Sequence, residues 1–287
     1  MRSIAFDSIV RTTADLCIQA AYELPEDLSA AVRKALQTES SPRARLILQQ
    51  LLENAAIAAH ERIPICQDTG LTVVFAEAGS EVRIAAPPEK SSATLMDAIQ
   101  EGAALACKEG LLRASVAAEP LNKRLNTNTN TPAFVHLSIV PGERLRLSVL
   151  LKGGGCENKS RFEMFNPTES PQTVCRWIVQ TVQDAGPNAC PPFVVGVGLG
   201  GDFEWCCLLS KKALLRPVGS THPDPFYASL EETLLKDINA LGLGPQGLGG
   251  DTTALAVHIE TAPCHIASLP AAVNIDCHAH RHKTAVL

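Results

Sequence analysis

The 287-residue chain has no excess of positive charge. Its 25 lysine and arginine residues are outnumbered by 30 aspartate and glutamate residues, and the formal net charge at pH 7 is -5. Proteins that bind the phosphate backbone of a nucleic acid carry a basic surface. The composition therefore argues against a nucleic acid as a partner.

The chain also has no long apolar run and no leader-like amino terminus. The uncharged stretch 186–201 contains three prolines and several glycines, and it is shorter than the roughly 20 apolar residues that a membrane helix needs. The amino-terminal residues meet an acid at Asp7 and lack the apolar core and small-residue cleavage site of a signal peptide. We expect a soluble, cytoplasmic protein with no membrane as a partner.

Ten cysteines are present, but no two of them have the Cys-x2-Cys spacing that is usual in structural zinc sites. In the reducing cytosol, and in a chain with 46% hydrophobic residues, cysteines are better interpreted as thiols and ligands than as disulfides. Five of them lie in apolar patterns and are predicted to pack in the core: Cys17, Cys107, Cys175, Cys206 and Cys207.

Three further cysteines lie in dense polar motifs. Cys66 is in PICQDTG (64–70), Cys190 in NACPP (188–192) and Cys277 in DCHAHRH (276–282). Thiolates are the usual protein ligands of iron–sulfur clusters, and four cysteines saturate a four-iron cluster. Three ligands leave one iron open, and an open metal can act as a Lewis acid on a substrate oxygen. The motifs thus predict a hydro-lyase cluster rather than an electron carrier.

The order of helix and strand signals predicts a mixed α+β fold with a helical amino-terminal part. We expect one domain over residues 1–287, with helices in 1–62 and room for a bilobed form. A strand at 71–75 would place the Cys66 motif in a loop. Segments 134–140 and 145–150 alternate around Pro-Gly-Glu, which predicts a hairpin. Further helices are predicted at 91–112, 171–185, 203–215 and 225–241, and strands at 193–195 and 253–260.

Two glycine-rich segments have local interpretations. In KGGG (152–155), backbone N–H groups can converge on an anion, while a turn that only glycine tolerates explains the residues equally well. The Gly-Lys-Ser/Thr order of a phosphate-binding loop is absent. GVGLGG (196–201) is interpreted as a turn and lacks the acidic residue of a dinucleotide site. A nucleotide-binding protein is therefore the weaker alternative.

Several polar residues have both a functional and a local interpretation. Asp68 lies two residues from Cys66, where a carboxylate could transfer a proton to substrate, yet Asp-Thr-Gly is also ordinary turn chemistry. Arg113 ends a predicted helix, where the helix dipole favours a cation. His278, His280 and His282 alternate and suggest zinc, which the absence of paired cysteines argues against.

Beyond these local patterns, the chain resembles the iron–sulfur hydro-lyases that comprise class I fumarate hydratases and the α subunit of L(+)-tartrate dehydratase. The resemblance rests on separated motifs in one order: PICQDTG (64–70), LR (112–113), NT (126–127), NTPA (130–133), KGGG (152–155), CPP (190–192) with its glycine-rich continuation, TTALAVHIE (252–260), HIA (265–267) and CHA (277–279).

The resemblance implies a [4Fe-4S] cluster on Cys66, Cys190 and Cys277, whose open iron would bind the hydroxyl and a carboxylate of a 2-hydroxy dicarboxylic acid. It also implies a substrate pocket, with Asp68 as the acid for the departing hydroxyl and a paired Arg113 contact to a carboxylate. The implied substrate-binding residues are Gln67, Asp68, Arg113, the Gly155 backbone and His265. His265 taken alone is more typical of a buried structural histidine.

The activity that the resemblance implies is reversible hydration of fumarate to malate, with conversion of L(+)-tartrate to oxaloacetate as the alternative. In similar single-chain enzymes a further carboxy-terminal domain supplies the catalytic base. We therefore expect a separate β subunit to supply it, in an α₂β₂ assembly with the active site at the subunit interface. A rival hypothesis is a non-catalytic zinc-binding or scaffold subunit.

Three residues depart from the pattern of the family. Cys156 follows the glycines where serine is expected, and Cys264 precedes His265 where threonine is common. Both are expected to bring extra thiols near the site. Asp251 stands where a basic residue is more usual, which bears on the identity of the substrate.

Overall fold

The structure is a computed structural model that describes residues 2–287, and these residues divide into two compact units. Unit 1 contains the described residues up to Pro25 together with Ile57–Gly153 and Arg281–Leu287. Unit 2 contains Glu26–Ala56 and Gly154–His280. Within residues 2–287, no helix has both the length and the apolar content that crossing a membrane requires.

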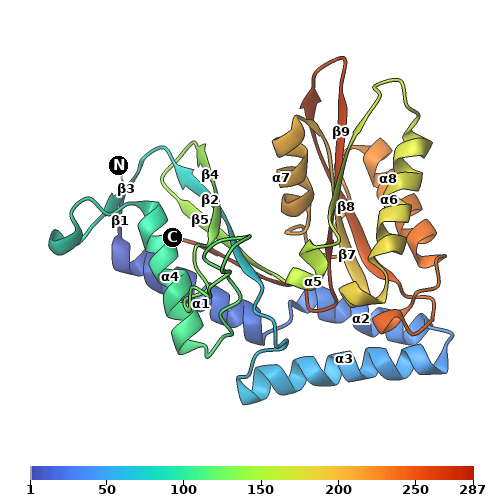
Figure 1. The fold of residues 1–287 in the computed structure, drawn as a ribbon, viewed down its shortest axis with the longest axis horizontal. Coiled ribbons are helices and arrows are strands. Elements are labelled where there is room, and N and C mark those ends of the chain that lie inside the picture. Colours follow the sequence, from blue (N-terminus) through green and yellow to red (C-terminus); the bar gives the residue numbers. More distant parts are fainter. Residues whose placement is uncertain (1) are drawn as a thin grey trace. The chain divides into compact units, whose positions relative to one another are not determined.

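Unit 1 is a four-stranded sheet covered by two helices (Figure 1). The strands lie in the order β10-β5-β2-β4, and α1 packs against α4, β5 and β10. Buried side chains such as Phe6, Ile99 and Leu147 form the core between the helices and the sheet. The elements are β1 (Arg2–Ala5), α1 (Phe6–Tyr22), β2 (Leu71–Gly79), β3 (Val82–Ala85), η1 (Pro88–Lys90), α4 (Leu95–Glu109), β4 (Phe134–Val140), β5 (Leu145–Lys152) and β10 (Arg281–Val286), with β1 and β3 paired in parallel.

The predicted hairpin of residues 134–150 is wrong, although both strands exist. Strand β2 lies between β4 and β5, parallel to the first and antiparallel to the second. In a hairpin, β4 and β5 would bond to each other near their connection. Instead the end of β2 bonds to both, because the Ser80 N–H donates to the Val140 carbonyl and the Gly79 N–H donates to the Arg144 carbonyl. A long-range partner thus replaces the local one.

Unit 2 is a four-stranded sheet in the order β6-β9-β7-β8, with helices on both faces (Figure 1). Helix α7 packs along β7, β8 and β9, while α8 packs on β8 and against α6. The elements are α2 (Glu26–Thr38), α3 (Pro42–Glu61, which continues into unit 1), α5 (Gly154–Glu157), β6 (Arg161–Phe165), α6 (Pro171–Ala185), η2 (Pro187–Ala189), β7 (Phe193–Gly201), α7 (Phe203–Ala213), α8 (Pro225–Asn239), η3 (Pro245–Gly247), β8 (Ala254–Cys264) and β9 (Leu269–Asp276).

The glycine-rich segment 196–201, which was interpreted as a turn, is part of strand β7. A Cβ atom on Gly196 would lie 2.0 Å from the Ser210 carbonyl oxygen, and one on Gly198 would lie 2.0 Å from that of Cys206. The glycines therefore let the backbone of α7 approach the strand closely. Their role is packing of a helix on a sheet.

The predicted α+β class is confirmed, as are the amino-terminal helices. The start of α6 is also as predicted, because the Ser170 hydroxyl accepts a hydrogen bond from the Thr173 N–H at 3.2 Å. Of the five cysteines predicted to pack in the core, Cys17, Cys107 and Cys206 are buried and Cys175 and Cys207 are half-buried. Burial raises the pKa of Cys17 and of Cys206 to about 12, which keeps both as protonated thiols at neutral pH.

Candidate functional site

The Cys66 motif lies in the loop between α3 and β2, as predicted. The loop is held at one side by the Ile65 N–H, which donates to the Ala21 carbonyl at 2.9 Å. At the other side Gly70 has a φ of 75° and meets the end of β5, where an added Cβ would lie 2.3 Å from the Lys152 carbonyl oxygen. Only glycine fits there. Cys66 is half-buried and Gln67 is exposed.

The Asp68 carboxylate is held within unit 1 by two hydrogen bonds. Its Oδ1 atom accepts from the Gly70 N–H at 2.9 Å and from the Ser115 hydroxyl at 3.0 Å. The first bond confirms the turn that the sequence suggested, and the second comes from a distant segment. The buried Arg281 guanidinium also donates to the Asp68 carbonyl at 2.5 Å. Asp68 is thus positioned by residues from three parts of the chain.

Asn130 connects the segment after α4 to the Asp68 loop. Its Oδ1 atom accepts from the Ser115 N–H at 2.8 Å, and its Nδ2 donates to the Gly70 carbonyl at 3.1 Å. The Asn130 side chain is buried. Asn130 and Arg281 lie within the motifs NTPA and DCHAHRH, whereas Ser115 lies outside the motifs. The sequence predicts no role for the three, because their importance depends on contacts between distant segments.

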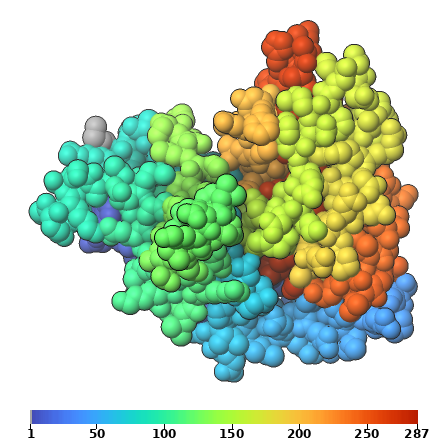
Figure 2. Space-filling view, viewed as in Figure 1, coloured from blue at the N-terminus to red at the C-terminus, as the bar shows by residue number. Residues whose placement is uncertain are grey.

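Arg113 lies in a loop rather than at the end of a helix. Helix α4 ends at Glu109, and Leu111 has a φ of 47°, so the chain leaves the helix before Arg113. The helix-dipole interpretation is therefore wrong. Arg113 is exposed, and the segment around it forms part of the green surface layer of unit 1 in Figure 2. Ser115, two residues later, brings this loop to Asp68.

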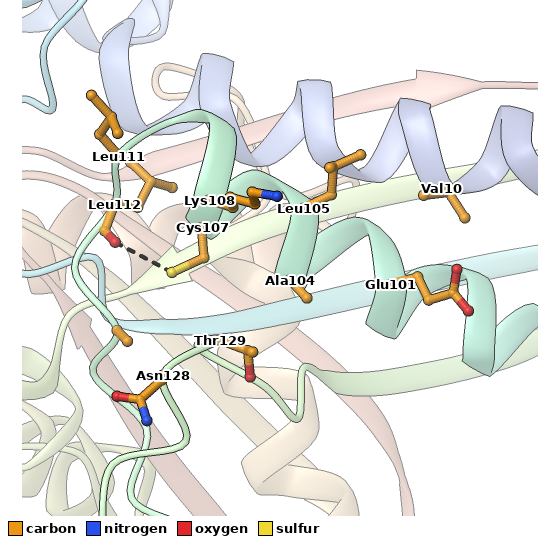
Figure 3. Close-up of a pocket in the computed structure, with 11 residues that line it drawn as sticks. Val10, Glu101, Ala104, Leu105, Cys107, Lys108, Leu111, Leu112, Asn128 and Thr129 are labelled. Atoms are coloured by element: carbon orange, nitrogen blue, oxygen red, sulfur yellow. Dashed lines mark hydrogen bonds between the residues drawn. The ribbon is translucent and has the colours of Figure 1, made fainter.

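A shallow pocket of about 800 Å³ lies beside this loop in unit 1 (Figure 3). It is lined mostly by apolar side chains of α1, α4 and the loop, with Glu101 and Lys108 as its charged members. The Cys107 thiol donates to the Leu112 carbonyl at 3.2 Å, and burial raises the pKa of that thiol. None of the predicted site residues lines this pocket.

In unit 2, the pairing of the two central strands β7 and β9 brings Cys190 and Cys277 to the same end of the sheet. Cys277 follows the end of β9, and Cys190 lies shortly before β7. These strands are antiparallel, with Val194 opposite Asp276. The His278 N–H donates to the Cys190 carbonyl at 3.2 Å, which joins the two segments directly. Two of the three predicted cluster ligands therefore lie in adjoining segments. Cys66 lies in unit 1, and its convergence on the other two stays a prediction.

Cys277 also belongs to a compact group with Cys156 and Asp276. The two Sγ atoms and a carboxylate oxygen of Asp276 all lie within 4.8 Å of one another, and the three residues are buried. The His280 Nδ1 atom lies 2.8 Å from Asp276 Oδ2. His278 and His280 precede β10 and contact different residues, Gln246 and Asp276, so the alternating histidines do not share one face of a strand.

Gly155 and His265 lie in different parts of unit 2. Gly155 is an exposed residue of α5, and its φ is not positive, so the strained-turn interpretation is wrong for it. His265 is exposed in the turn between β8 and β9, where its Nδ1 atom accepts from the Ala267 N–H at 3.1 Å. This turn lies at the opposite end of the sheet from Cys190 and Cys277 (Figure 1). The usual rise per residue over the length of β9 makes the separation roughly 25 Å. Within unit 2 the structure does not bring His265 to the cysteines, and its role stays a prediction.

The three departures from the family pattern have separate outcomes. Cys156 lies beside Cys277, as expected. Cys264 does not lie near Cys277, because it ends β8 beside His265, and its thiol donates to the Ser268 carbonyl at 3.4 Å. The Asp251 carboxylate accepts from the Ser40 N–H at 2.9 Å, and hydrogen bonding from Ser40 lowers the pKa of Asp251. Asp251 therefore helps to hold the loop before β8 against the segment between α2 and α3 within unit 2.

His258 of β8 is a buried histidine, and only 1% of its surface is exposed. Among residues 2–287 neither ring nitrogen makes a hydrogen bond of good geometry, and its contact with the Ala213 backbone contributes least to its pKa. Burial, aided by the positive charge of Arg216, lowers the pKa of His258 to about 4. The Glu231 carboxylate raises that pKa and the His280 imidazole lowers it, by smaller amounts. His258 is therefore neutral in the folded chain at physiological pH.

This environment predicts a loss of stability in acid. The unfolded chain takes up a proton at His258 near pH 6.5, while the folded chain does so only near pH 4. The free energy of unfolding should thus fall by about 2 kcal/mol between pH 7 and pH 5 through this group alone. Urea unfolding at each pH measures it, with His258→Leu expected to remove that part of the pH dependence. The exposed control His60→Gln should keep it, and equal slopes in His258→Leu and the parent chain would contradict the account.

Comparison with known proteins agrees with this arrangement of motifs. The model of the fumarate hydratase (Fumerase) family matches residues 10–286. A putative L(+)-tartrate dehydratase subunit alpha of Methanocaldococcus jannaschii is 38% identical over 93% of both chains. An L(+)-tartrate dehydratase subunit alpha of Escherichia coli is 32% identical over 99% of this chain and 92% of its own length. The match to the family model and these full-length relatives show that the chain belongs to the fumarate hydratase (Fumerase) family.

Proposed function

We propose that the chain is the α subunit of a [4Fe-4S]-dependent hydro-lyase that reversibly hydrates fumarate to malate in the cytoplasm. Membership of the fumarate hydratase family supports a hydro-lyase reaction. The observation that carries the proposal is the pairing of β7 with β9, which brings the Cys190 and Cys277 segments together at one edge of unit 2.

The residues of this edge suit an iron–sulfur group. Thiolates are the preferred ligands of such clusters, and the edge combines the predicted ligands Cys190 and Cys277 with the further thiol of Cys156. Cys66, presented on the loop before β2, is proposed as the third ligand. When bound, a cluster with three protein ligands supplies a Lewis acid through its open iron.

Asp68 is proposed to donate the proton to the departing hydroxyl of malate and to take it back during hydration. The Gly70 N–H and the Ser115 hydroxyl both bind Oδ1, which fixes the plane of the carboxylate. A side chain held in one orientation can give a proton to a bound substrate as the carboxylic acid and take it back as the carboxylate. The exposed guanidinium of Arg113 is proposed to bind a substrate carboxylate, and Gln67 and the Gly155 backbone are proposed as further substrate contacts.

A separate β subunit is proposed to supply the base that removes the carbon-bound proton, in an α₂β₂ assembly with the active site at the interface. The names of the relatives support a divided enzyme, because each is called a subunit alpha. No nucleic acid is expected in the assembly, given the net charge of -5.

L(+)-tartrate is the second candidate substrate, and the names of the two relatives favour it. The test is co-expression of the chain with the product of a neighbouring reading frame, anaerobic reconstitution with iron and sulfide, and initial rates with malate, fumarate and L(+)-tartrate. We expect kcat/KM for malate and fumarate to exceed that for tartrate by at least about tenfold, about 1.4 kcal/mol in the barrier. The reverse preference makes the chain a tartrate dehydratase subunit, and a colourless, inactive pair with one bound zinc contradicts the proposal.

A further inference from the structure

Cys156, Asp276 and Cys277 place three metal-binding atoms together inside unit 2. The exposed fractions are 4% for Cys156, 1% for Asp276 and 9% for Cys277, so all three are shielded from solvent. In the metal-free chain the sulfur atoms are thiols, and Cys156 donates a hydrogen bond. Once deprotonated, two thiolates and a carboxylate form a donor set that suits a thiolate-binding divalent cation.

The fold holds each member of the group in place. Asp276 is the last residue of β9, and His280 Nδ1 lies 2.8 Å from its Oδ2 atom. The helix that carries Cys156, α5, is tied down by Glu157, whose carboxylate pairs with Lys211 of α7 at 2.5 Å and accepts from Asn274 of β9 at 3.3 Å. Cys156 itself donates to the Ala189 carbonyl at 3.3 Å. These contacts act as the supporting shell that orients metal ligands in proteins.

The distances suit a single ion. Three atoms that are no more than 4.8 Å apart all lie within about 2.8 Å of a common point. Zinc–sulfur bonds are about 2.3 Å long and zinc–oxygen bonds about 2.0–2.2 Å. A movement of roughly half an ångström per atom therefore brings the group to bonding distance. An ion held by three protein ligands would take a water as its fourth ligand, as in other tetrahedral sites of this kind.

We propose that Cys156 gives the cluster-free chain a mononuclear site for a thiolate-binding divalent ion such as Zn²⁺, with Cys156, Cys277 and Asp276 as ligands. Binding releases the thiol protons to solvent. Because Cys277 is also a proposed cluster ligand, the ion and the cluster exclude each other. This exclusion rests on the proposed function, whereas ion binding stands on the geometry of unit 2 alone.

The test uses Co²⁺ as the probe, added to the reduced, metal-free full chain under anaerobic conditions. We expect one equivalent to bind, with sulfur-to-metal charge-transfer absorption and the visible bands of a four-coordinate ion. In Cys156→Ser the charge-transfer intensity should fall by roughly half, because one of two thiolates is gone, and affinity should weaken by at least about tenfold. Asp276→Asn should keep the intensity and weaken affinity. Zn²⁺ should displace the Co²⁺.

Two control variants separate this site from the cluster and from other thiols. Cys264→Ser removes an exposed thiol at the far end of the sheet and should bind Co²⁺ like the parent chain. Cys66→Ser removes a proposed cluster ligand and should also bind Co²⁺ normally, even if the hydro-lyase proposal fails. Unchanged spectra in Cys156→Ser, with circular dichroism showing a folded chain, would overturn the inference. Loss of the signal in Cys66→Ser would overturn its assignment to unit 2.

Discussion

Asp68→Asn in the two-subunit enzyme is expected to lower kcat for malate and fumarate by about 10² to 10⁴-fold. Asparagine keeps the shape of the side chain and an oxygen that accepts from Gly70 and Ser115. It cannot give or take a proton, and general acid–base help is worth about that factor. Steady-state rates over a range of pH measure the effect, and cluster absorption should be the same as in the parent enzyme.

Ser115 is a positioning residue in this account, so its variants test Asp68 indirectly. Ser115→Ala removes one of the hydrogen bonds to Asp68 Oδ1, and we expect kcat to fall by roughly tenfold with an altered pH profile, while KM changes little. Ser115→Thr keeps the hydroxyl and should restore most of the rate. Full activity in Asp68→Asn, or equal losses in Ser115→Ala and Ser115→Thr, would contradict the role of Asp68.

Glu39→Ala is expected to reduce the free energy of unfolding of unit 2 by about 3–5 kcal/mol. The Glu39 carboxylate is 3% exposed and receives the N–H groups of Asp251 and Thr252 and the Thr252 hydroxyl at 2.9–3.0 Å. It thereby joins the segment between α2 and α3 to the loop before β8. Its removal leaves buried donors without an acceptor, each of which costs about 1–3 kcal/mol.

Urea unfolding of the cluster-free chain measures this loss. Both tryptophans, Trp177 and Trp205, lie in unit 2, so their fluorescence reports its unfolding. Glu39→Gln keeps an acceptor and should cost less than alanine. The matched control Glu53→Ala removes an exposed glutamate of α3 and should change stability by less than about 0.5 kcal/mol. If Glu39→Ala were as mild as Glu53→Ala, the hydrogen bonds at Glu39 would not stabilise the fold.

Features fixed by local chemistry could be predicted from the sequence. The helix that begins after Ser170, the strand at 71–75 and the loop position of Cys66 follow from capping, β-branched and aromatic residues, and proline placement, and all three are present. The prediction of which strands pair with each other was less successful. The hairpin of 134–150 failed because β2 inserts between β4 and β5, and strand order depends on the whole chain.

Composition also misleads where tertiary packing decides the outcome. The glycines of 196–201 read as a turn, yet they lie in β7 because α7 packs against them. Likewise Ser115, Asn130 and Glu39 each have partners 15 or more residues away, which no local pattern shows. The residue types of the cysteine motifs suit iron, and Cys190 and Cys277 lie in adjoining segments. Cys156 differs in sequence only as a departure from the family pattern, and its place beside Cys277 depends on the fold.

The central claim is that Cys66, Cys190 and Cys277 hold one cluster, and the most direct test is iron content and absorption near about 400 nm after anaerobic reconstitution. The parent chain should bind about four irons with the broad band of a four-iron cluster. Cys66→Ala should lose both by at least about tenfold, whereas Cys175→Ala, which removes a half-buried thiol of α6, should keep both. Retention of the iron and of the band in Cys66→Ala would contradict the account.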